Sequence, residues 1–356
     1  MIGTLLSGDL PRSRILTALL VVIFLGLALA PFLFPGVRSV DTAARISIFI
    51  VLVASYDLLL GYAGIVSFAH TMFFGIGAYG VALTLQAMGR GWDAVLIGTL
   101  AGAGTAAAIA LVIGLFSLRV RAIFFAMITL AVASAVGVLV SQLSGLTGGE
   151  DGLNIQIPRE LTPAFKFGGE LWGVKLNGKL LAYYLVFGTA LVLFLLMLRI
   201  VNSPFGRTLL AVRENDFRAE AIGYPVVRYR TAATCLSAAI AALAGALYAL
   251  WLRYVGPETV LSMELMIDIL LMVVIGGMGT IWGAVIGATL FVIAQNYLQE
   301  VMGWASAATE GVPLLPNLLD PDRWLLWLGL LFVLSVYFFP AGIVGRLRAG
   351  KWNDPK

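Results

Sequence analysis

The stretch from residue 263 to residue 299 reads MELMIDILLMVVIGGMGTIWGAVIGATLFVIAQNYLQ. It is one apolar run, interrupted only by GGMGTIWG at 276–283. A single helix of this length would extend about 55 Å at 1.5 Å per residue, whereas the hydrocarbon core of a bilayer is about 30 Å thick. The run therefore has to turn, and its glycines mark the expected turn between two spanning helices.

The composition of the whole chain agrees with this membrane interpretation. Of the 356 residues, 60% are apolar and the mean hydropathy is +0.98, whereas soluble domains contain roughly 45–50% apolar residues. A soluble protein of this composition would have too few polar side chains to cover its surface. One cysteine and one histidine exclude a disulfide framework and a multi-histidine metal cluster. The modest net charge of +4 does not indicate a nucleic-acid partner.

The hydropathy pattern predicts an all-α polytopic membrane protein with one transmembrane domain over residues 1–356. Ten apolar segments are candidate spans: 15–35, 43–60, 64–88, 94–118, 122–142, 180–199, 231–252, 263–280, 281–299 and 324–340. Gly75, Gly77 and Gly80 predict a break or kink within 64–88. The segment at 15–35 faintly resembles a signal peptide, because ALA precedes Pro31, but its length favours a retained anchor helix.

The distribution of Lys and Arg predicts the orientation, because loops on the cytoplasmic side are enriched in these residues. Ten spans put both termini on one side, which would also hold the following basic groups: Arg12, Arg14, the Arg119/Arg121 turn, the 200–230 loop and the tail with Arg346, Arg348, Lys351 and Lys356. The other side would hold the loops at 143–179 and 300–323, the second of which carries Glu310, Asp320 and Asp322 but only Arg323. We therefore expect both termini and the 200–230 loop in the cytoplasm.

Residues 202–230, NSPFGRTLLAVRENDFRAEAIGYPVVRYR, carry eight charges in a chain that is only 12% charged. Apolar residues recur at helical spacing from 209 to 222, and Gly223 and Pro225 form a stop signal. An amphipathic helix of about twelve residues is marginal alone in water, so it needs a surface to pack against. A helix lying on the membrane and a helix docked into another protein both fit this pattern.

The chain resembles the LivH/LivM permease family, the membrane subunits of ABC importers for branched-chain amino acids and related solutes. The resemblance rests on the charged insert and the LSAAIAALAGALYA run after it (236–249), and on four further stretches: GYAGIVSFAHTMFFGIGAY (61–79), SLRVRAIFFAMITLA (117–131), LTGGEDGL (146–153) and GPETVLSMELMIDILLMVVIGGMGTIWGAVIGA (256–288). These stretches occur in the family's order from about residue 45 to residue 346. The long N-terminal extension and SLRVRAIFFA make the chain more similar to the LivM-like subunit.

The resemblance implies that the cytoplasmic helix sits in a groove on an ATPase subunit and transmits its closure to the bundle. The matching positions are Arg213, Glu214, Asn215, Asp216, Ala219, Glu220, Ala221 and Gly223, with Phe217 as the apolar anchor. Glu214, Asp216 and Glu220 are expected to matter most. Arg228 and Arg230 are expected only to hold the end of the next span in the cytoplasm.

The resemblance also implies the partners and the location of the protein. The partners would be a LivH-like permease, two ATPase subunits and a periplasmic solute-binding protein, assembled in the lipid of a bacterial inner membrane. The chain has no G-x-x-x-x-G-K-[ST] phosphate loop, so ATP would be bound by the partner subunits and this chain would need no cofactor. The 143–179 loop would face the periplasm and offers charged residues to the binding protein: Glu150, Asp151, Arg159, Glu160, Lys166 and Lys175.

Four residues are candidates for the solute pathway: His70, Gly75, Gly77 and Asp268. Ionisable groups within the membrane are costly, so Asp268, with Glu264 one turn earlier, is either a pore-facing or packing residue or part of a proton relay. His70 is either a hydrogen-bonded residue of the bundle or a substrate contact. The glycines either line a cavity or allow tight helix packing.

Two other classes of protein remain as alternatives. An ion-coupled secondary carrier would transport alone and respond to the proton gradient. A membrane-embedded enzyme would need clustered catalytic residues, which one histidine and one cysteine far apart do not supply. The solute is the least specified feature, because relatives with this pattern carry urea, short amides or other small organic solutes as well as branched-chain amino acids.

Overall fold

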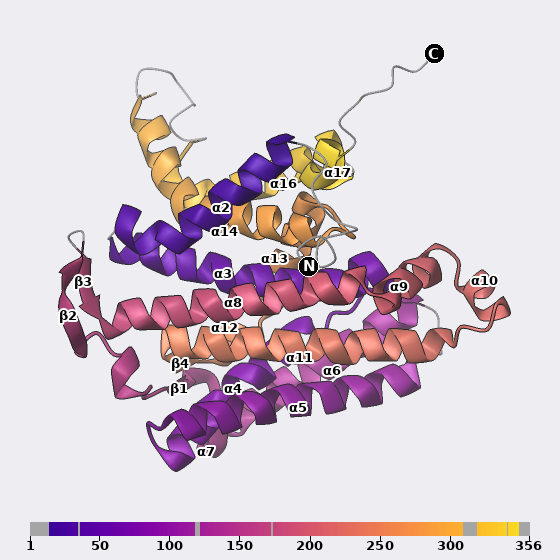
Figure 1. Ribbon diagram of the computed structural model, residues 1–356, viewed down its shortest axis with the longest axis horizontal. Helices are drawn as coiled ribbons and strands as arrows, with labels where there is room; N and C mark the ends of the chain where they lie inside the picture. Colours follow the sequence, from indigo (N-terminus) through magenta and orange to yellow (C-terminus); the bar gives the residue numbers. More distant parts are fainter. Residues whose placement is uncertain are drawn as a thin grey trace.

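Long helices make up most of the structure, a computed structural model that describes residues 14–34, 36–117, 122–171, 174–308, 319–339 and 341–348 (Figure 1). Within these ranges, nine helices are long and apolar enough to cross a membrane. They are α2 (Arg14–Leu33), α3 (Val37–Asp57) continued by the π-helical η1 (Leu58–Ala63), α4 (His70–Met88), α5 (Trp92–Ser117), α6 (Ala122–Gln142), α8 (Gly178–Asn202), α11 (Val226–Leu252), α13 (Met263–Gly276) preceded by the one-turn α12 (Pro257–Val260), and α14 (Ile281–Ala308). The expected all-α polytopic fold is confirmed.

The helices run between two ends of the bundle, which lie at opposite sides of Figure 1. One end, called the hairpin end here, carries the antiparallel strands β2 (Lys166–Leu171) and β3 (Val174–Asn177). The other, called the α10 end, carries α9 (Pro204–Glu214) and α10 (Asp216–Ala221). Tyr184, near the start of α8, donates a hydrogen bond to the carbonyl oxygen of Ala28 at 2.9 Å. Since α8 starts at the hairpin end, α2 runs from the α10 end to the hairpin end.

The tenth expected span, 324–340, is a shorter helix than its neighbours. α16 (Trp324–Phe338) has 15 residues and ends two residues before Pro340, so it extends about 22 Å. The short helix η4 (Pro321–Arg323) before it contacts α14, and α17 (Gly342–Arg348) after it contacts α13, α14 and α2. The residues before α16 lie near the end of α14, because a Cβ on Gly303, late in α14, would lie 3.6 Å from Pro321. The residues after α16 lie at the start of the α13–α14 turn, where Gly342 contacts Gly277. α16 therefore returns beside α14 to the α10 end.

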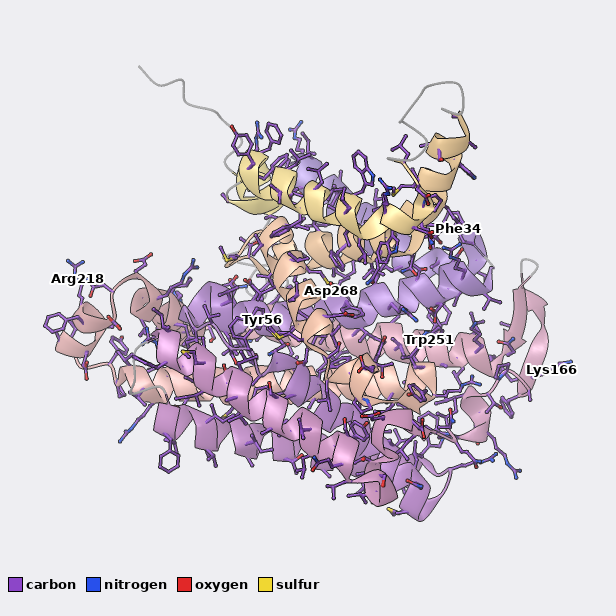
Figure 2. The ribbon with its side chains drawn as sticks, turned by 180° about the vertical axis from the view of Figure 1, so that it is seen from behind. Phe34, Tyr56, Lys166, Arg218, Trp251 and Asp268 are labelled. Carbon is purple, nitrogen blue, oxygen red and sulfur yellow. The ribbon has the colours of Figure 1, made fainter. Side chains whose placement is uncertain are left out.

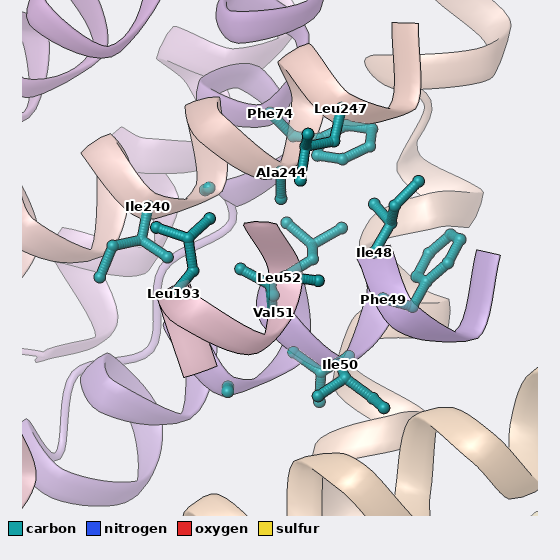
Figure 3. Packing of buried hydrophobic residues seen from close by; sticks show 14 of the residues in the cluster. Ile48, Phe49, Ile50, Val51, Leu52, Phe74, Leu193, Ile240, Ala244 and Leu247 are labelled. Carbon is teal, nitrogen blue, oxygen red and sulfur yellow. The ribbon is translucent and has the colours of Figure 1, made fainter. Parts of the chain in front are cut away.

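Helix α3 is the centre of the bundle. In the most apolar window of α3 and η1, 94% of the residues are buried, against 11% in α6. α3 contacts α2, α8, α11, α13 and α14. Figure 3 shows Ile48, Val51 and Leu52 of α3 between side chains of α4, α8 and α11. Residues 48–54 of α3, IFIVLVA, are all apolar, and a helical segment that is apolar on every side is typical of such a central position.

Small residues set the spacing of α4, α5 and α11, which pack closely on one side of α3. A Cβ added to Gly77 would overlap the carbonyl oxygen of Ala242 in α11, and one added to Gly80 would lie 3.0 Å from the Cα of Gly102 in α5. In lipid, such small residues let helix backbones approach one another. α4 continues unbroken through Gly75, Gly77 and Gly80, so the prediction that these glycines break the segment is wrong: here they serve packing.

The break in this part of the chain lies earlier, at 64–69. η1 ends at Ala63 with Gly64 in the left-handed conformation, residues 64–69 are not helical, and α4 begins at His70. The His70 ring lies beside Ser55, with 2.8 Å between His70 Nε2 and Ser55 Oγ. Ser55 is eight residues before the end of η1, so the chain passes back along α3 before α4 starts.

The expected turn in the 263–299 run is confirmed between Gly276, the last residue of α13, and Ile281, the first residue of α14. Gly277 and Gly279 have φ values of +118° and +78°. Only glycine adopts such backbone conformations without strain, which explains why this run turns at GGMG.

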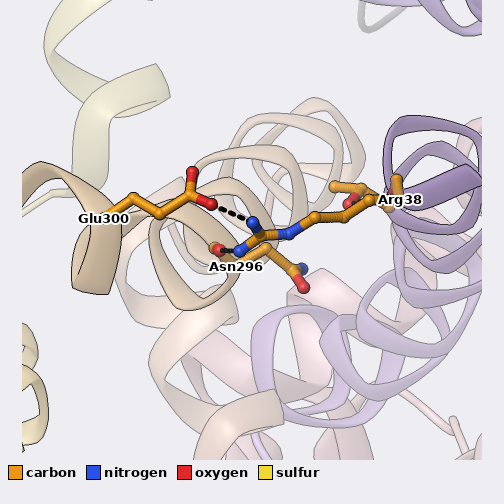
Figure 4. Close-up of polar contacts among 4 residues, drawn as sticks. Arg38, Asn296 and Glu300 are labelled. Atoms are coloured by element: carbon orange, nitrogen blue, oxygen red, sulfur yellow. Dashed lines mark hydrogen bonds and ion pairs between the residues drawn. The ribbon is translucent and has the colours of Figure 1, made fainter. Parts of the chain in front are cut away.

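The hairpin end is ordered by short elements rather than by a structureless loop. The 143–179 segment contains α7 (Ser144–Thr147), η2 (Gly149–Asp151), β1 (Leu153–Asn154), η3 (Arg159–Leu161), β2 and β3. β1 pairs antiparallel with β4 (Tyr254–Val255), which follows α11. At the same end, the Trp251 indole donates to the Asp41 carboxylate at 2.7 Å. Figure 4 shows Arg38 donating to the Glu300 carboxylate and to the carbonyl oxygen of Asn296, which ties the start of α3 to α14.

Replacing Gly77 with Ala is expected to destabilise the bundle, because the added methyl group would overlap the α11 backbone. Overpacking of this kind costs about 1–3 kcal/mol. Gly104→Ala is a matched control, since a Cβ at Gly104 of α5 meets nothing within 4 Å. The apparent Tm in detergent should fall for Gly77→Ala and stay unchanged or rise for Gly104→Ala. Equal Tm values for the two variants would contradict the close α4–α11 contact.

Candidate functional site

The charged insert folds into two short helices, α9 and α10, at one end of the bundle. α9 begins at Pro204, with the Ser203 side chain accepting from the Gly206 N–H at 3.4 Å, as expected for an N-cap followed by proline. Leu209 and Val212 of α9 are fully buried. The apolar side of α9 therefore packs on the bundle itself.

The single helix expected over 209–222 is split at Asn215. Asn215 has an extended backbone, with φ −159° and ψ 97°, and its side chain accepts from the Arg218 N–H at 2.8 Å. Asparagine favours this capping geometry over a helix interior, so Asn215 ends α9 and starts α10. The predicted end is confirmed, because α10 stops at Ala221 and Gly223 has φ +98°.

A small cluster of buried residues holds α10 to the bundle. Val212 of α9, Ala219 of α10 and Val226 of α11 pack together. The Asp216 carboxylate forms an ion pair with the Arg230 guanidinium at 3.6 Å. Arg230 therefore also pairs with a residue of α10, whereas the sequence predicted only that it holds the end of the next span in the cytoplasm.

The outward side of the loop is both apolar and charged. Phe217 is 82% exposed and Ile222 is 69% exposed. Around them, most of the predicted coupling residues are also exposed: Glu214, Asn215, Asp216, Glu220, Ala221 and Gly223. Figure 2 shows this region, marked by Arg218, at the far side of the molecule from Lys166 in the β2–β3 hairpin. The loop thus presents a surface with an unpartnered aromatic side chain surrounded by charges.

Arg213 differs from its neighbours in direction. Its guanidinium donates a hydrogen bond to the carbonyl oxygen of Gly61 in η1, 152 residues earlier in the chain. The predicted coupling residues therefore divide between those on the outward surface and two, Arg213 and Ala219, that contact the bundle.

The three pathway candidates on α4 lie inside the bundle. His70 is fully buried, and Ser55, which lies next to it, accepts a hydrogen bond through its carbonyl oxygen from Ser237 of α11 at 2.6 Å. Gly75 lies against Leu261 and Gly77 against Ala242. This geometry favours the packing interpretation of these residues in the conformation described here.

Asp268 lies apart from the other candidates, on α13. It is half-buried, it has the side chain of Gln295 on α14 as its hydrogen-bond neighbour, and Glu264 lies one turn earlier on the same helix. In Figure 2 the Asp268 label lies on α13 near the middle of the bundle's length. A carboxylate and an amide at this depth are costly against lipid hydrocarbon, so this side of α13 and α14 is expected to meet water or protein.

A cavity of about 530 Å³ opens between α6 and the α12–α13 segment, close to the hairpin end. Its lining includes three carboxylates, Glu150, Glu258 and Glu264, and three serines, Ser134, Ser141 and Ser262. In the sequence, Glu150 stands out only as a charge in the 143–179 loop, and Glu258 does not stand out. Their signal in the sequence is weak, because the two residues are more than 100 positions apart.

The structure also contains a buried carboxylate that the sequence interpretation overlooked. Asp57 is 1% exposed, and its Oδ1 accepts from the Gly279 N–H at 2.8 Å. Its signal was present, since Asp57 falls inside the expected span 43–60 and an ionisable residue within a span is a functional candidate by default.

A comparison with known families identifies this arrangement. Residues 39–336 match the family described as "Branched-chain amino acid transport system / permease component". The chain belongs to this family. The permease is therefore a transport subunit rather than an enzyme, and the expected resemblance to the LivH/LivM family is confirmed.

Individual relatives agree with this assignment. The permease is 30% identical over 298 residues to the high-affinity branched-chain amino acid transport system permease protein LivM of Salmonella typhimurium, covering 80% of this chain and 69% of the relative. It is 29% identical to LivM of Escherichia coli over 87% of this chain and 75% of the relative. It is 27% identical to BraD of Pseudomonas aeruginosa over 84% of this chain and 92% of the relative. No solved structure matches the chain closely enough to support a comparison.

Proposed function

We propose that the permease is one of two membrane-spanning subunits of an ATP-driven importer that moves branched-chain or related amino acids into the cell by alternating access. The relatives named above are permease proteins of high-affinity branched-chain amino acid systems, which supports this choice of solute. The observation that carries the proposed mechanism is the outward surface of α10, which lies at one end of the bundle in Figure 1 and on which Phe217 is 82% exposed.

This surface is suited to docking in a groove of an ATPase subunit. Aromatic side chains, including Phe, are enriched at the core of protein interfaces, and the rim around that core is polar. Glu214, Asp216 and Glu220 offer negative charge that can set the register against a basic groove. ATP is then bound and hydrolysed by two partner ATPase subunits. This chain binds no nucleotide and moves in response to them.

The same surface sets the proposed orientation in the bacterial inner membrane. If α10 meets a cytoplasmic ATPase, the α10 end is cytoplasmic and the hairpin end is periplasmic. Arg14, at the start of α2, and Arg346, in α17, lie at the α10 end. The hairpin end also holds basic residues, such as Arg38, Arg159 and Lys179, so the proposed orientation rests on the docking of α10. Arg12, the Arg119/Arg121 turn, Glu310 and the residues Lys351 and Lys356 lie outside the described residues, and both termini are proposed to be cytoplasmic.

The other two partners are assigned to the remaining surfaces. A periplasmic solute-binding protein would dock at the hairpin end, where the β2–β3 hairpin extends from the bundle and Glu160 of η3 is exposed. A LivH-like permease would cover the polar side of α13 and α14, because Asp268 and Gln295 would otherwise lie against lipid. The solute pathway would then run along this side, from the cavity between α6 and α12–α13 past Asp268.

Truncating the α10 anchor is expected to weaken the association with the ATPase. In reconstituted transporter, Phe217→Ala should cost about 2 kcal/mol or more, roughly thirtyfold in affinity. Co-purification of the ATPase and solute uptake into liposomes would measure this loss. Leu100→Ala is the matched control, since Leu100 is 62% exposed on α5, away from the α10 end. Substrate-stimulated ATP hydrolysis that survives Lys at positions 214, 216 and 220 together would contradict the coupling assignment.

Changing Asp268 is expected to impair transport without dissociating the complex, because Asp268 lies far from α10 along the chain and on another helix. Asp268→Leu removes the carboxylate, and Asp268→Asn retains a polar group of the same shape. Uptake should fall at least about tenfold for Asp268→Leu and less for Asp268→Asn, with ATPase co-purification unchanged. Normal uptake by Asp268→Leu would remove this residue from the pathway.

A further inference from the structure

Arg213 reaches from the end of α9 into a junction between two separate parts of the bundle. Its guanidinium donates to the carbonyl oxygen of Gly61 in η1. A Cβ on Gly64 would lie 3.0 Å from Arg213 Cγ, and one on Gly279 would lie 2.9 Å from Arg213 Nη1. Arg213 is exposed on its outer side, and on its inner side it contacts the residues that end η1 and the α13–α14 turn.

Asp57 joins the same two parts from inside the bundle. Its buried Oδ1 accepts from the Gly279 N–H at 2.8 Å, which ties the α13–α14 turn to the end of α3. Gly61 lies between them, and a Cβ added there would overlap both Asp57 Oδ1 and Gly279 N. The missing side chains of Gly61 and Gly279 are thus what allows the three segments to meet.

The two charged side chains act on opposite backbone groups of this junction. Arg213 donates to a carbonyl oxygen and Asp57 accepts from an N–H, and both contacts are charge-assisted. Such contacts are about twice as strong as neutral hydrogen bonds. A buried carboxylate needs partners of this kind, because an uncompensated charge in the interior is strongly destabilising.

We infer that Arg213 and Asp57 form the joint through which a movement of α9 reaches the membrane helices. The inference rests on the proposed function, in which an ATPase displaces the α9–α10 loop. Arg213 transmits this displacement to Gly61 in η1, and Asp57 and Gly279 carry it on to the α13–α14 turn. η1 is a π-helical turn, a departure from α-helical bonding that is frequent at functional positions. α13 carries Asp268, so the joint connects α10 with the proposed pathway.

The joint predicts a variant that keeps its ATPase but loses coupling. In the complete transporter reconstituted in liposomes, Arg213→Gln and Asp57→Asn should each lower the amount of solute transported per ATP hydrolysed by about fivefold or more. Co-purification of the ATPase should stay unchanged, because Phe217 and the outward charges are intact. Arg213→Lys retains a donor for the Gly61 carbonyl oxygen and should restore part of the ratio. The double variant should be no worse than either single one, since both act on one junction.

Arg199→Gln is the matched control, because Arg199 is an exposed arginine in the last turn of α8 at the same end of the bundle. A normal transport-to-hydrolysis ratio in both Arg213→Gln and Asp57→Asn would overturn the joint while leaving the docking of Phe217 intact. If the ATPase no longer co-purified with Arg213→Gln, the proposed joint would also be overturned, since Arg213 would then be a docking residue. Failure of the unaltered chain to bind any ATPase would instead refute the proposed function.

Discussion

A break in a membrane-spanning helix has to satisfy its backbone polar groups without water wherever it lies at the depth of the hydrocarbon, because lipid chains supply no hydrogen-bond partners. The non-helical residues 64–69 meet this constraint with several contacts: Ile65 N–H to Leu59 O at 2.9 Å, Phe68 N–H to Thr129 Oγ1 of α6 at 3.1 Å, and Ala69 N–H to Ser67 Oγ at 3.3 Å. The α13–α14 turn meets it through Asp57. The Asp57–Gly279 contact and the Arg213–Gly61 contact join segments that are far apart in sequence, and they place the end of η1, the α13–α14 turn and α9 at one junction.

The long spans were predictable from the sequence because apolar length alone determines them. The 263–299 run is too long for one crossing, and its turn occurs at the glycines that the sequence indicates. The glycines of 64–88 led to an error, because small residues serve both helix breaks and close helix packing. In α4 they pack against α11 and α5, while the break comes at 64–69. Hydropathy also overestimated the length of the last span, because the expected segment runs to residue 340 and α16 ends at Phe338.

The candidate site was predictable only in part, for a related reason. A dense group of charges in an apolar chain marks the α9–α10 loop clearly, and Gly223 marks its end. The split at Asn215 was not foreseen, because helical periodicity continues across it and only the local backbone reveals the cap. The joint was not foreseen either. Arg213 and Asp57 bond to backbone atoms of glycines 152 and 222 residues away, and no spacing in the sequence announces such contacts.

The central claim is that the outward surface of α10 contacts an ATPase, and photo-crosslinking from position 217 tests it most directly. A photoreactive phenylalanine analogue in place of Phe217, in the transporter assembled in membranes, should form a covalent product with the ATPase subunit. The same analogue in place of Leu100, on the exposed side of α5, should react with lipid and not with the ATPase. Lipid products alone from position 217 would contradict the account and would make α10 a helix lying on the membrane.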